Sequence, residues 1–163
     1  MRSFFCSLLF IFSTNTFSVN NNLILADSFP EKLSEFGFFI DYSAQEPHKK
    51  VIPYELISTL FSDYSYKQRW VYVPDHAKAT YVKDWVFDFP EGSALIKTFY
   101  YPIDERNPDL GKQLLETRLL LRKKDGWEAV SYAWNKEQNE AYKKIAGKTI
   151  NVSWTDFMGD QRQ

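Results

Sequence analysis

The feature that most constrains this fold is a pair of strand-like segments around Asp125-Gly126, a dipeptide typical of tight β-hairpin turns. Residues 114–124 precede the turn and residues 127–135 follow it. Apolar and polar side chains alternate in both segments, which is the period of a strand with one buried face. The two segments are therefore predicted to form an antiparallel hairpin.

A turn at Asp125-Gly126 places Lys124 opposite Trp127 and sets the register of the hairpin. Six side chains then share a predicted core face as three cross-strand pairs: Leu121 with Val130, Leu119 with Tyr132, and Thr117 with Trp134. The other face carries Arg118 and Arg122 and is predicted to be solvated. A slip by one residue would bury both arginines, which favours this choice of faces.

Further strands are predicted at residues 69–73, 79–82, 85–89, 93–101 and 149–154. The segment 93–101 is apolar on both faces, as expected of a central strand. Short helices are predicted at 31–36, ended by Gly37, and at 136–146, capped by Asn135 and ended by Gly147. The result is one mainly β domain over residues 29–154, an antiparallel β-sandwich or partly open barrel with one or two short helices. Residues 155–163 are expected to form a C-terminal tail.

The N-terminal residues have the pattern of a secretory signal peptide, because Arg2 precedes a mostly apolar run over residues 4–12. Cleavage after Ser18 is preferred, and cleavage after Ala26 is the second candidate; an uncleaved N-terminal anchor is the alternative. The run is too short for a transmembrane helix, and no later stretch is long enough. The chain is expected to be periplasmic or secreted, with no membrane span after cleavage of residues 1–18.

Composition narrows the classes of function. Lys and Arg number 20 and Asp and Glu 21, so the net charge of −1 argues against a nucleic-acid partner. The sequence has one Cys, inside the N-terminal apolar run, and two His, His48 and His76, in polar segments expected at the surface. These residues form no zinc-ligand pattern and no catalytic Cys/His pair, and no nucleophile elbow or phosphate loop is present. No catalytic, cofactor-binding or metal-binding residue is therefore assigned, and an enzyme is disfavoured.

Aromatic residues, which make up 18% of the chain, are the remaining candidates for binding. Aromatic rings on a sheet can stack on sugars or bases, although a β core also uses such rings as filler. The candidate binding residues are Trp70, Trp85 and Trp134, together with Arg106 in a polar loop.

Eight short motifs occur in order along residues 29–154: LSEFGFF (33–39), VIPYEL (51–56), LFSDY (60–64), VFDFP (86–90), LIKTF (95–99), LETRLL (115–120), DGW (125–127) and YAWNKEQ (132–138). Together they resemble the N-terminal, non-haem region of a family of secreted bacterial di-haem c-type cytochromes of uncharacterised role. In that family a C-terminal part follows and carries Cys-x-x-Cys-His motifs, which hold covalent haem. No such motif is present here, so no cofactor is expected in this chain.

Two functions follow from these observations. The first is an exported, haem-free β domain that serves as an accessory or interaction module in periplasmic electron transfer, with a separate c-type cytochrome as its partner and no catalysis of its own. The second is a secreted carbohydrate-binding module or a glycan-acting hydrolase, which predicts a row of exposed Trp or Tyr rings on one face.

Overall fold

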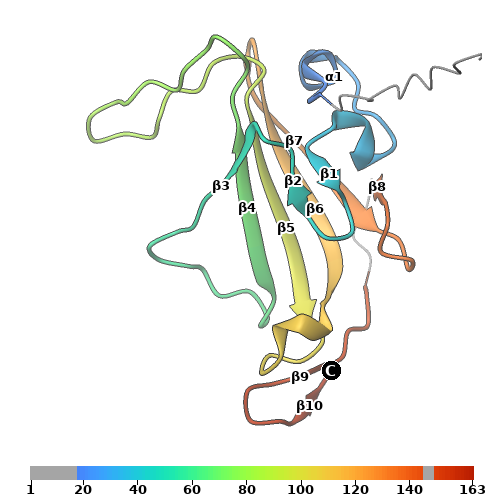
Figure 1. Ribbon diagram of the computed structural model, residues 1–163. Helices are drawn as coiled ribbons and strands as arrows, with labels where there is room; N and C mark the ends of the chain where they lie inside the picture. Colours follow the sequence, from blue (N-terminus) through green and yellow to red (C-terminus); the bar gives the residue numbers. More distant parts are fainter. Residues whose placement is uncertain (1–17, 145–148) are drawn as a thin grey trace, which may run out of the picture.

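Six antiparallel strands form the central sheet, in the order β3-β4-β5-β6-β7-β8 (Figure 1). The computed structural model describes residues 18–144 and 149–163. The strands of the central sheet are β3 Val51–Pro53, β4 Tyr66–Tyr72, β5 Ala94–Pro102, β6 Lys112–Lys123, β7 Gly126–Trp134 and β8 Ala141–Lys143. The sheet does not close into a barrel, because its edge strands β3 and β8 do not pair with each other.

The smaller elements lie around this sheet. Two further sheets have two strands each. In one, β1 (Phe39–Asp41) pairs with β2 (Glu46–Pro47), and in the other, β9 (Trp154–Thr155) pairs with β10 (Gln161–Arg162). The described helices are α1 (Asn21–Leu25) and the 3-10 helices η1 (Leu33–Phe36) and η2 (Pro108–Leu110). The predicted mainly β, antiparallel class is therefore confirmed.

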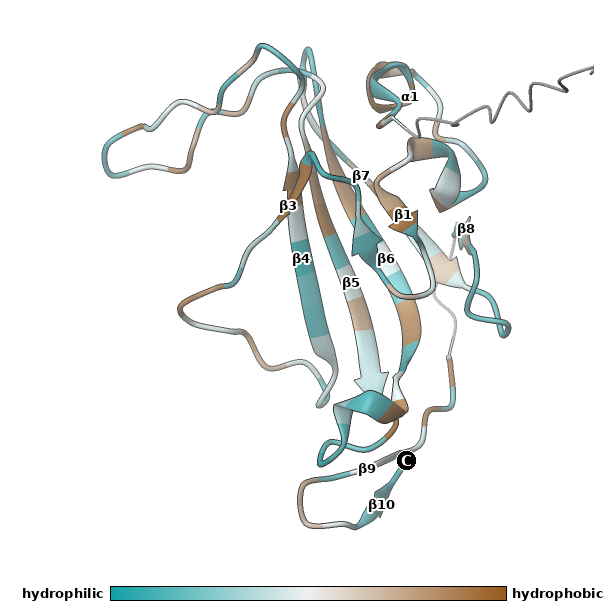
Figure 2. Ribbon diagram, in the orientation of Figure 1, coloured by the Kyte–Doolittle hydropathy of each residue, from teal (hydrophilic) through white to brown (hydrophobic). Residues whose placement is uncertain are grey.

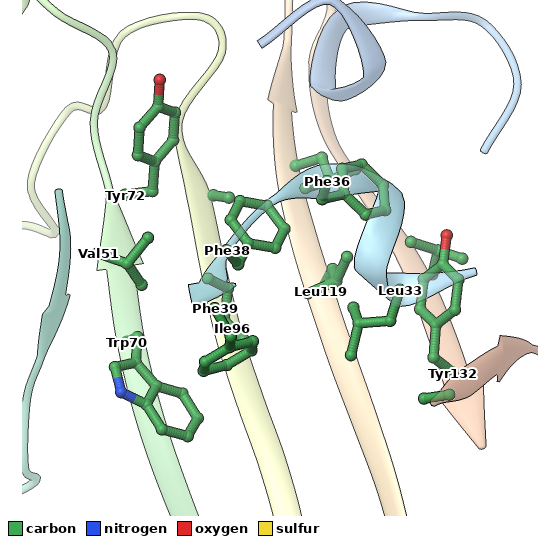
Figure 3. Close-up of a cluster of buried hydrophobic side chains, with 14 of the residues drawn as sticks. Leu33, Phe36, Phe38, Phe39, Val51, Trp70, Tyr72, Ile96, Leu119 and Tyr132 are labelled. Carbon is green, nitrogen blue, oxygen red and sulfur yellow. The ribbon is translucent and has the colours of Figure 1, made fainter. Parts of the chain in front are cut away.

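The N-terminal elements α1, η1, β1 and β2 cover one face of the sheet (Figures 1 and 3). Their largest apolar side chains are at most 2% exposed: Ile24, Leu33, Phe36, Phe38 and Phe39. The Phe36 ring meets the Tyr132 ring edge-on at 6.0 Å, and the Phe39 ring meets Trp70 in the same way at 4.9 Å. The second layer of the fold is thus a short N-terminal segment rather than a second large sheet.

Strands β6 and β7 form the predicted hairpin, but the register differs from the prediction by two residues. Lys123 pairs with Gly126, so Lys124 and Asp125 are the turn residues, and Arg122 lies opposite Trp127. Glycine also suits the last position of a β-turn, which is where Gly126 stands. Because the shift is even, every side chain keeps its face. All six predicted core residues are buried, which confirms the predicted core face: Thr117, Leu119, Leu121, Val130, Tyr132 and Trp134.

Two other predicted strands are present and two are not. The segment 93–101 corresponds to β5, which lies between β4 and β6 as a central strand, and the segment 69–73 lies largely within β4. The segments 79–82 and 85–89 form an exposed loop, in which Thr80 and Asp88 make an isolated bridge. Asp84 has a φ of +61° between them, a turn conformation, and their side chains have no further strand to pack against.

The predicted helix 136–146 is wrong, because the chain turns back and adds β8 to the sheet. The Asn135 side chain accepts hydrogen bonds from the backbone N–H groups of Asn139 (3.1 Å) and Glu140 (3.3 Å), which closes a tight turn instead of capping a helix. Ala141 then becomes fully buried in β8. The predicted helix end at Gly147 lies outside the described residues.

The other helix prediction holds in a tighter form. Residues 33–36 form the 3-10 helix η1, and Gly37 ends it with a φ of +71°. A Cβ atom at position 37 would lie 2.6 Å from the Ser18 carbonyl oxygen, so this close approach also requires glycine. The predicted final strand 149–154 is mostly irregular, and only Trp154 belongs to β9.

A helix that the sequence did not indicate begins the described chain. The Asn20 side chain accepts a hydrogen bond from Leu23 N at 3.4 Å, which caps α1. Val19 (7% exposed) and Ile24 (0%) belong to the core. Most of the predicted signal peptide, residues 1–17, lies outside the described residues. A cut after Ala26 would remove two core side chains, whereas a cut after Ser18 would remove neither.

A chain that begins at Val19 is expected to fold as stably as the longer chain, and a chain that begins at Asp27 is expected to be much less stable. The expected difference in the free energy of unfolding is roughly 3–6 kcal/mol, because burial of a Val or Ile side chain contributes about 1.5–3 kcal/mol each. Urea denaturation of the two chains measures it. Equal denaturation midpoints would show that α1 does not stabilise the fold.

Buried side-chain hydrogen bonds link β5, β6 and β7. The Thr98 and Thr117 hydroxyl oxygens lie 2.7 Å apart, and Trp134 Nε1 donates to Thr117 Oγ1 at 3.0 Å. Thr98 and Thr117 are fully buried. The Thr117 hydroxyl therefore satisfies two buried polar groups at once.

Replacing Thr117 with Val should lower the free energy of unfolding by about 1–3 kcal/mol, because it leaves the Trp134 N–H and the Thr98 hydroxyl without partners. Thr98→Val is the matched control, with a smaller expected loss, since Thr117 keeps its bond to Trp134. Thermal and urea denaturation compare the two variants. A larger loss for Thr98→Val would contradict this assignment.

Candidate functional site

The sheet face opposite the N-terminal elements, called the outer face below, is open to solvent over its middle strands. An apolar row crosses it from β3 to β7 at one register level, and its members are Ile52, Val71, Leu95, Leu120 and Ala129. Ile52 is 61% and Leu120 41% exposed. Apolar side chains thus reach water on a face that no described helix covers.

A row of three cations lies beside the apolar row. Arg69 of β4 pairs with Lys97 of β5, and Lys97 pairs with Arg118 of β6, so the three side chains follow one another across adjacent strands. Neighbouring strands lie only about 4.7–4.9 Å apart. Like charges directly opposite each other destabilise a sheet, so the fold itself gives no reason for this row.

The three cations of the row differ in their surroundings. Arg118 donates from Nε to Glu116 at 2.6 Å, and the Glu116 carboxylate also lies 3.2 Å from Lys144 Nζ. Lys97 has no carboxylate partner within the described residues, and its Nζ lies 5.0 Å from the centre of the Phe99 ring. Arg69 is 7% exposed, and its side chain makes no ion pair or hydrogen bond in the described part of the chain.

Partial burial and neighbouring positive charges lower the pKa of Lys97 from its ordinary value. Partial burial of the ammonium group is the main cause, and the charges of Arg118, Arg69 and Lys67 lower it further. The nearby Glu116 carboxylate opposes the shift but does not cancel it. A bound anion near Lys97 would therefore relieve an unfavourable interaction.

A groove of about 900 Å³ lies at the edge of β4, next to the cation row. Lys67 and Arg69 of β4 form part of its wall, the loop 54–65 between β3 and β4 forms another, and the C-terminal β9–β10 hairpin closes one end. Figure 2 shows apolar residues along the loop 54–65, which stands out from the sheet. The apolar and aromatic residues that line the groove are Leu60, Phe61, Tyr64, Tyr66, Tyr100, Trp154, Phe157 and Met158.

Hydrogen bonds hold the groove walls in place. Lys67 Nζ donates to the Leu60 carbonyl oxygen at 2.8 Å, which ties the loop to β4. The Tyr66 hydroxyl donates to Glu105 Oε1 at 3.2 Å, and Phe157 N donates to Glu105 Oε2 at 2.9 Å. Glu105 therefore joins β4 to the C-terminal hairpin, and both of its oxygens are occupied.

The structure does not bring the four predicted binding residues together. Trp70 (3% exposed) and Trp134 (7%) lie in the core. Trp85 is 78% exposed in the loop 79–89. In the same loop the Phe87 ring packs against Phe89, which packs against Trp127 of β7. Arg106 lies in a different loop and is paired with Asp104 at 2.7 Å, which lowers the pKa of that carboxyl to about 2.

The residues of the cation row were missed because they come from three strands that are distant in the sequence. Only the alternation within each strand was visible there, not the register that aligns Arg69, Lys97 and Arg118. The prediction that His48 lies at the surface is also wrong. His48 is 6% exposed, and its Nδ1 accepts a hydrogen bond from Lys50 N at 3.2 Å, whereas His76 is exposed as expected.

Comparisons with protein families, with characterised proteins and with solved structures found no match for this chain. Among residues 18–144 and 149–163, no cluster of His, Cys, Asp or Glu side chains could hold a metal ion. None of the described helices is long and apolar enough to cross a membrane.

Replacing Lys97 with Met should raise the free energy of unfolding by roughly 0.2–1 kcal/mol at low ionic strength, because it removes two like-charge pairs from the cation row. The gain should shrink at high salt, which screens the repulsion. Lys124→Met, in the exposed β6–β7 turn, is the matched control and should change little.

The pH dependence of the same pair of proteins gives a second measurement. The pKa of Lys97 is lower in the folded than in the unfolded chain, so the unfolded chain binds more protons between the two pKa values. The stability of the wild type relative to Lys97→Met should therefore rise with pH in this alkaline range. A loss of stability in Lys97→Met that salt does not change would contradict the assigned repulsion.

Proposed function

We propose that this chain is an exported binding module without catalysis of its own, and that the outer face of its sheet contacts a partner protein. The observation that carries the proposal is an exposed apolar row beside a cation row, on a face that no helix of residues 18–144 and 149–163 covers. Protein interfaces combine an apolar centre with a polar rim in which Arg is enriched. The outer face has both parts side by side.

The cost of the cation row supports a binding role over a purely structural one. Residues kept at the expense of stability are typical of functional sites. Lys97 contributes no ion pair to the described fold, so its charge is available to a partner. Charge on an interface directs encounter and selects complementary surfaces.

The motif resemblance supplies the candidate partner. The eight motifs, in their order along the chain, resemble the non-haem region of secreted di-haem c-type cytochromes. We therefore propose that the module contacts a separate c-type cytochrome in the periplasm. Retention of the core residues Val19 and Ile24 after cleavage at Ser18 is compatible with export of a complete domain. The chain itself is proposed to be free of haem.

The alternative function, carbohydrate binding, is supported by one feature, the exposed rings of the loop 79–89. Tyr81 is 71%, Trp85 78% and Phe87 54% exposed. Rings so exposed can stack on sugars, but they lie on a loop and not in a row across the sheet. A glycan that raises the melting temperature of the wild type but not of Trp85→Ala would favour this function.

A photo-crosslinking residue at Leu120 tests the lead proposal. Leu120 is 41% exposed in the apolar row, so irradiation in the producing cell should join the chain to a protein that stains for haem. The matched control is Ile40, which is 55% exposed on β1, away from the outer face, and should give no such product. Equal products from both positions, no product from Leu120, or haem bound to the chain itself would contradict the proposal.

A further inference from the structure

The broad contact proposed for the outer face leaves one residue unexplained, Arg69. The residue as a whole is 93% buried, and its guanidinium keeps some contact with solvent without meeting a carboxylate of the described chain. Arg69 instead lies directly across from Lys97, a second cation. No described side chain accepts a hydrogen bond from it, although it lines the groove. A charge in a largely buried residue is costly unless it is paired.

The acidic residues around the groove do not supply the missing partner. Glu105 is engaged by Tyr66 and by the backbone of Phe157. Asp156 pairs with Arg162 at 2.6 Å. Glu55 also lines the groove and makes no ion pair with Arg69 in the described chain. Arg69 therefore lines a groove that a ligand can enter, and no carboxylate of the described residues forms an ion pair with it there.

Apolar and aromatic side chains line much of the rest of the groove, beside the polar residues Thr59, Ser62, Ser65, Lys67, Arg162 and Gln163. Phe61, Tyr64 and Phe157 are each 67% exposed, and Met158 is 85% exposed. The Phe61 and Tyr64 rings pack edge-on at 5.1 Å, which gives the loop wall an ordered aromatic surface. A volume of about 900 Å³ is within the range of small-molecule sites. Aromatic rings and the cation Arg69 thus line the same groove.

We propose that the groove binds a small anionic amphiphile, with its carboxylate or phosphate on Arg69 and its apolar part against Phe61, Tyr64 and Phe157. The planar guanidinium can donate two parallel hydrogen bonds to either head group. Lys97 lies beside Arg69 in the cation row and adds attraction for the same charge. This site goes beyond the proposed protein contact and does not depend on it.

Binding of four probes tests the chemistry of the site, with the fluorescence of Trp154 and isothermal titration calorimetry as readouts. The probes are dodecanoate, dodecyl phosphate, inorganic phosphate and the neutral dodecyl maltoside, all below their micelle concentrations. At least one of the two anionic amphiphiles should bind about tenfold or more tightly than the neutral one, since charge-assisted hydrogen bonds contribute about 1.5–3 kcal/mol. Comparison of dodecanoate with dodecyl phosphate separates the two head groups.

Two variants test the role of Arg69. Arg69→Met should bind both anionic amphiphiles at least about tenfold more weakly and lose the preference over the neutral probe. It should melt no lower than the wild type, because it removes a like charge from the cation row. Arg122→Met, on the outer face but outside the groove, is the matched control and should bind as the wild type.

Several results would overturn the proposal. These are the absence of binding by both anionic amphiphiles, equal binding of the neutral and anionic probes, unchanged binding by Arg69→Met, and an equal loss in Arg122→Met. Inorganic phosphate that binds as tightly as dodecyl phosphate would show a simple anion site and would overturn the role of the aromatic walls. Crosslinking from Leu120 reports on the protein contact separately, so the two proposals can fail independently.

Discussion

The packing of the N-terminal segment onto a single face of the sheet is the interaction on which the rest of the structure depends. Phe36, Phe38 and Phe39 fill the space above Ile96 and Leu119, and all five side chains are at most 2% exposed. A strand alternates its side chains, so burial of one face commits every second residue to the other. No described segment covers the middle of the outer face in the same way, and Leu120 and Trp127 are 41% and 40% exposed there.

Because of this arrangement, the side chains that do not help to stabilise the fold lie on the outer face. The core face holds rings, aliphatic side chains and the satisfied hydroxyls of Thr98 and Thr117. The outer face places Arg69, Lys97 and Arg118 next to one another although the chain has a net charge of only −1. Local conflicts of this kind are expected at binding sites, where a ligand or partner supplies the missing interaction. The groove and the cation row are the two features from which binding of a ligand and of a partner is proposed.

The sequence predicted the parts of the fold that depend on local alternation. The core faces of β6 and β7 were correct, because a period of two is visible within each strand. The predicted register of β6 and β7 was wrong by two residues, because Gly126 fits either of two turn positions. The helix at 136–146 failed because Asn135, a residue suited to both caps and turns, closes a turn that lets Ala141 reach the core.

The candidate site was much harder to predict. Arg69, Lys97 and Arg118 become neighbours only through pairing between strands that are far apart in the chain, and no local pattern carries that information. Trp70 and Trp134 were chosen as binding residues for their ring chemistry, yet both stand on the core face of their strands. The burial of Arg69 likewise depends on its position at the groove, which is formed by the loop 54–65 and the C-terminal hairpin.

Hydroxyl-radical footprinting of the purified protein tests the central claim, that one sheet face is covered and the other is open. On β6, Leu120 should oxidise readily while its neighbours Leu119 and Leu121 are protected. On β7, Trp127 should oxidise and Tyr132 should not. Protection of Leu120 and Trp127 as complete as that of Leu119 and Tyr132 would show a second covering layer and would contradict the account.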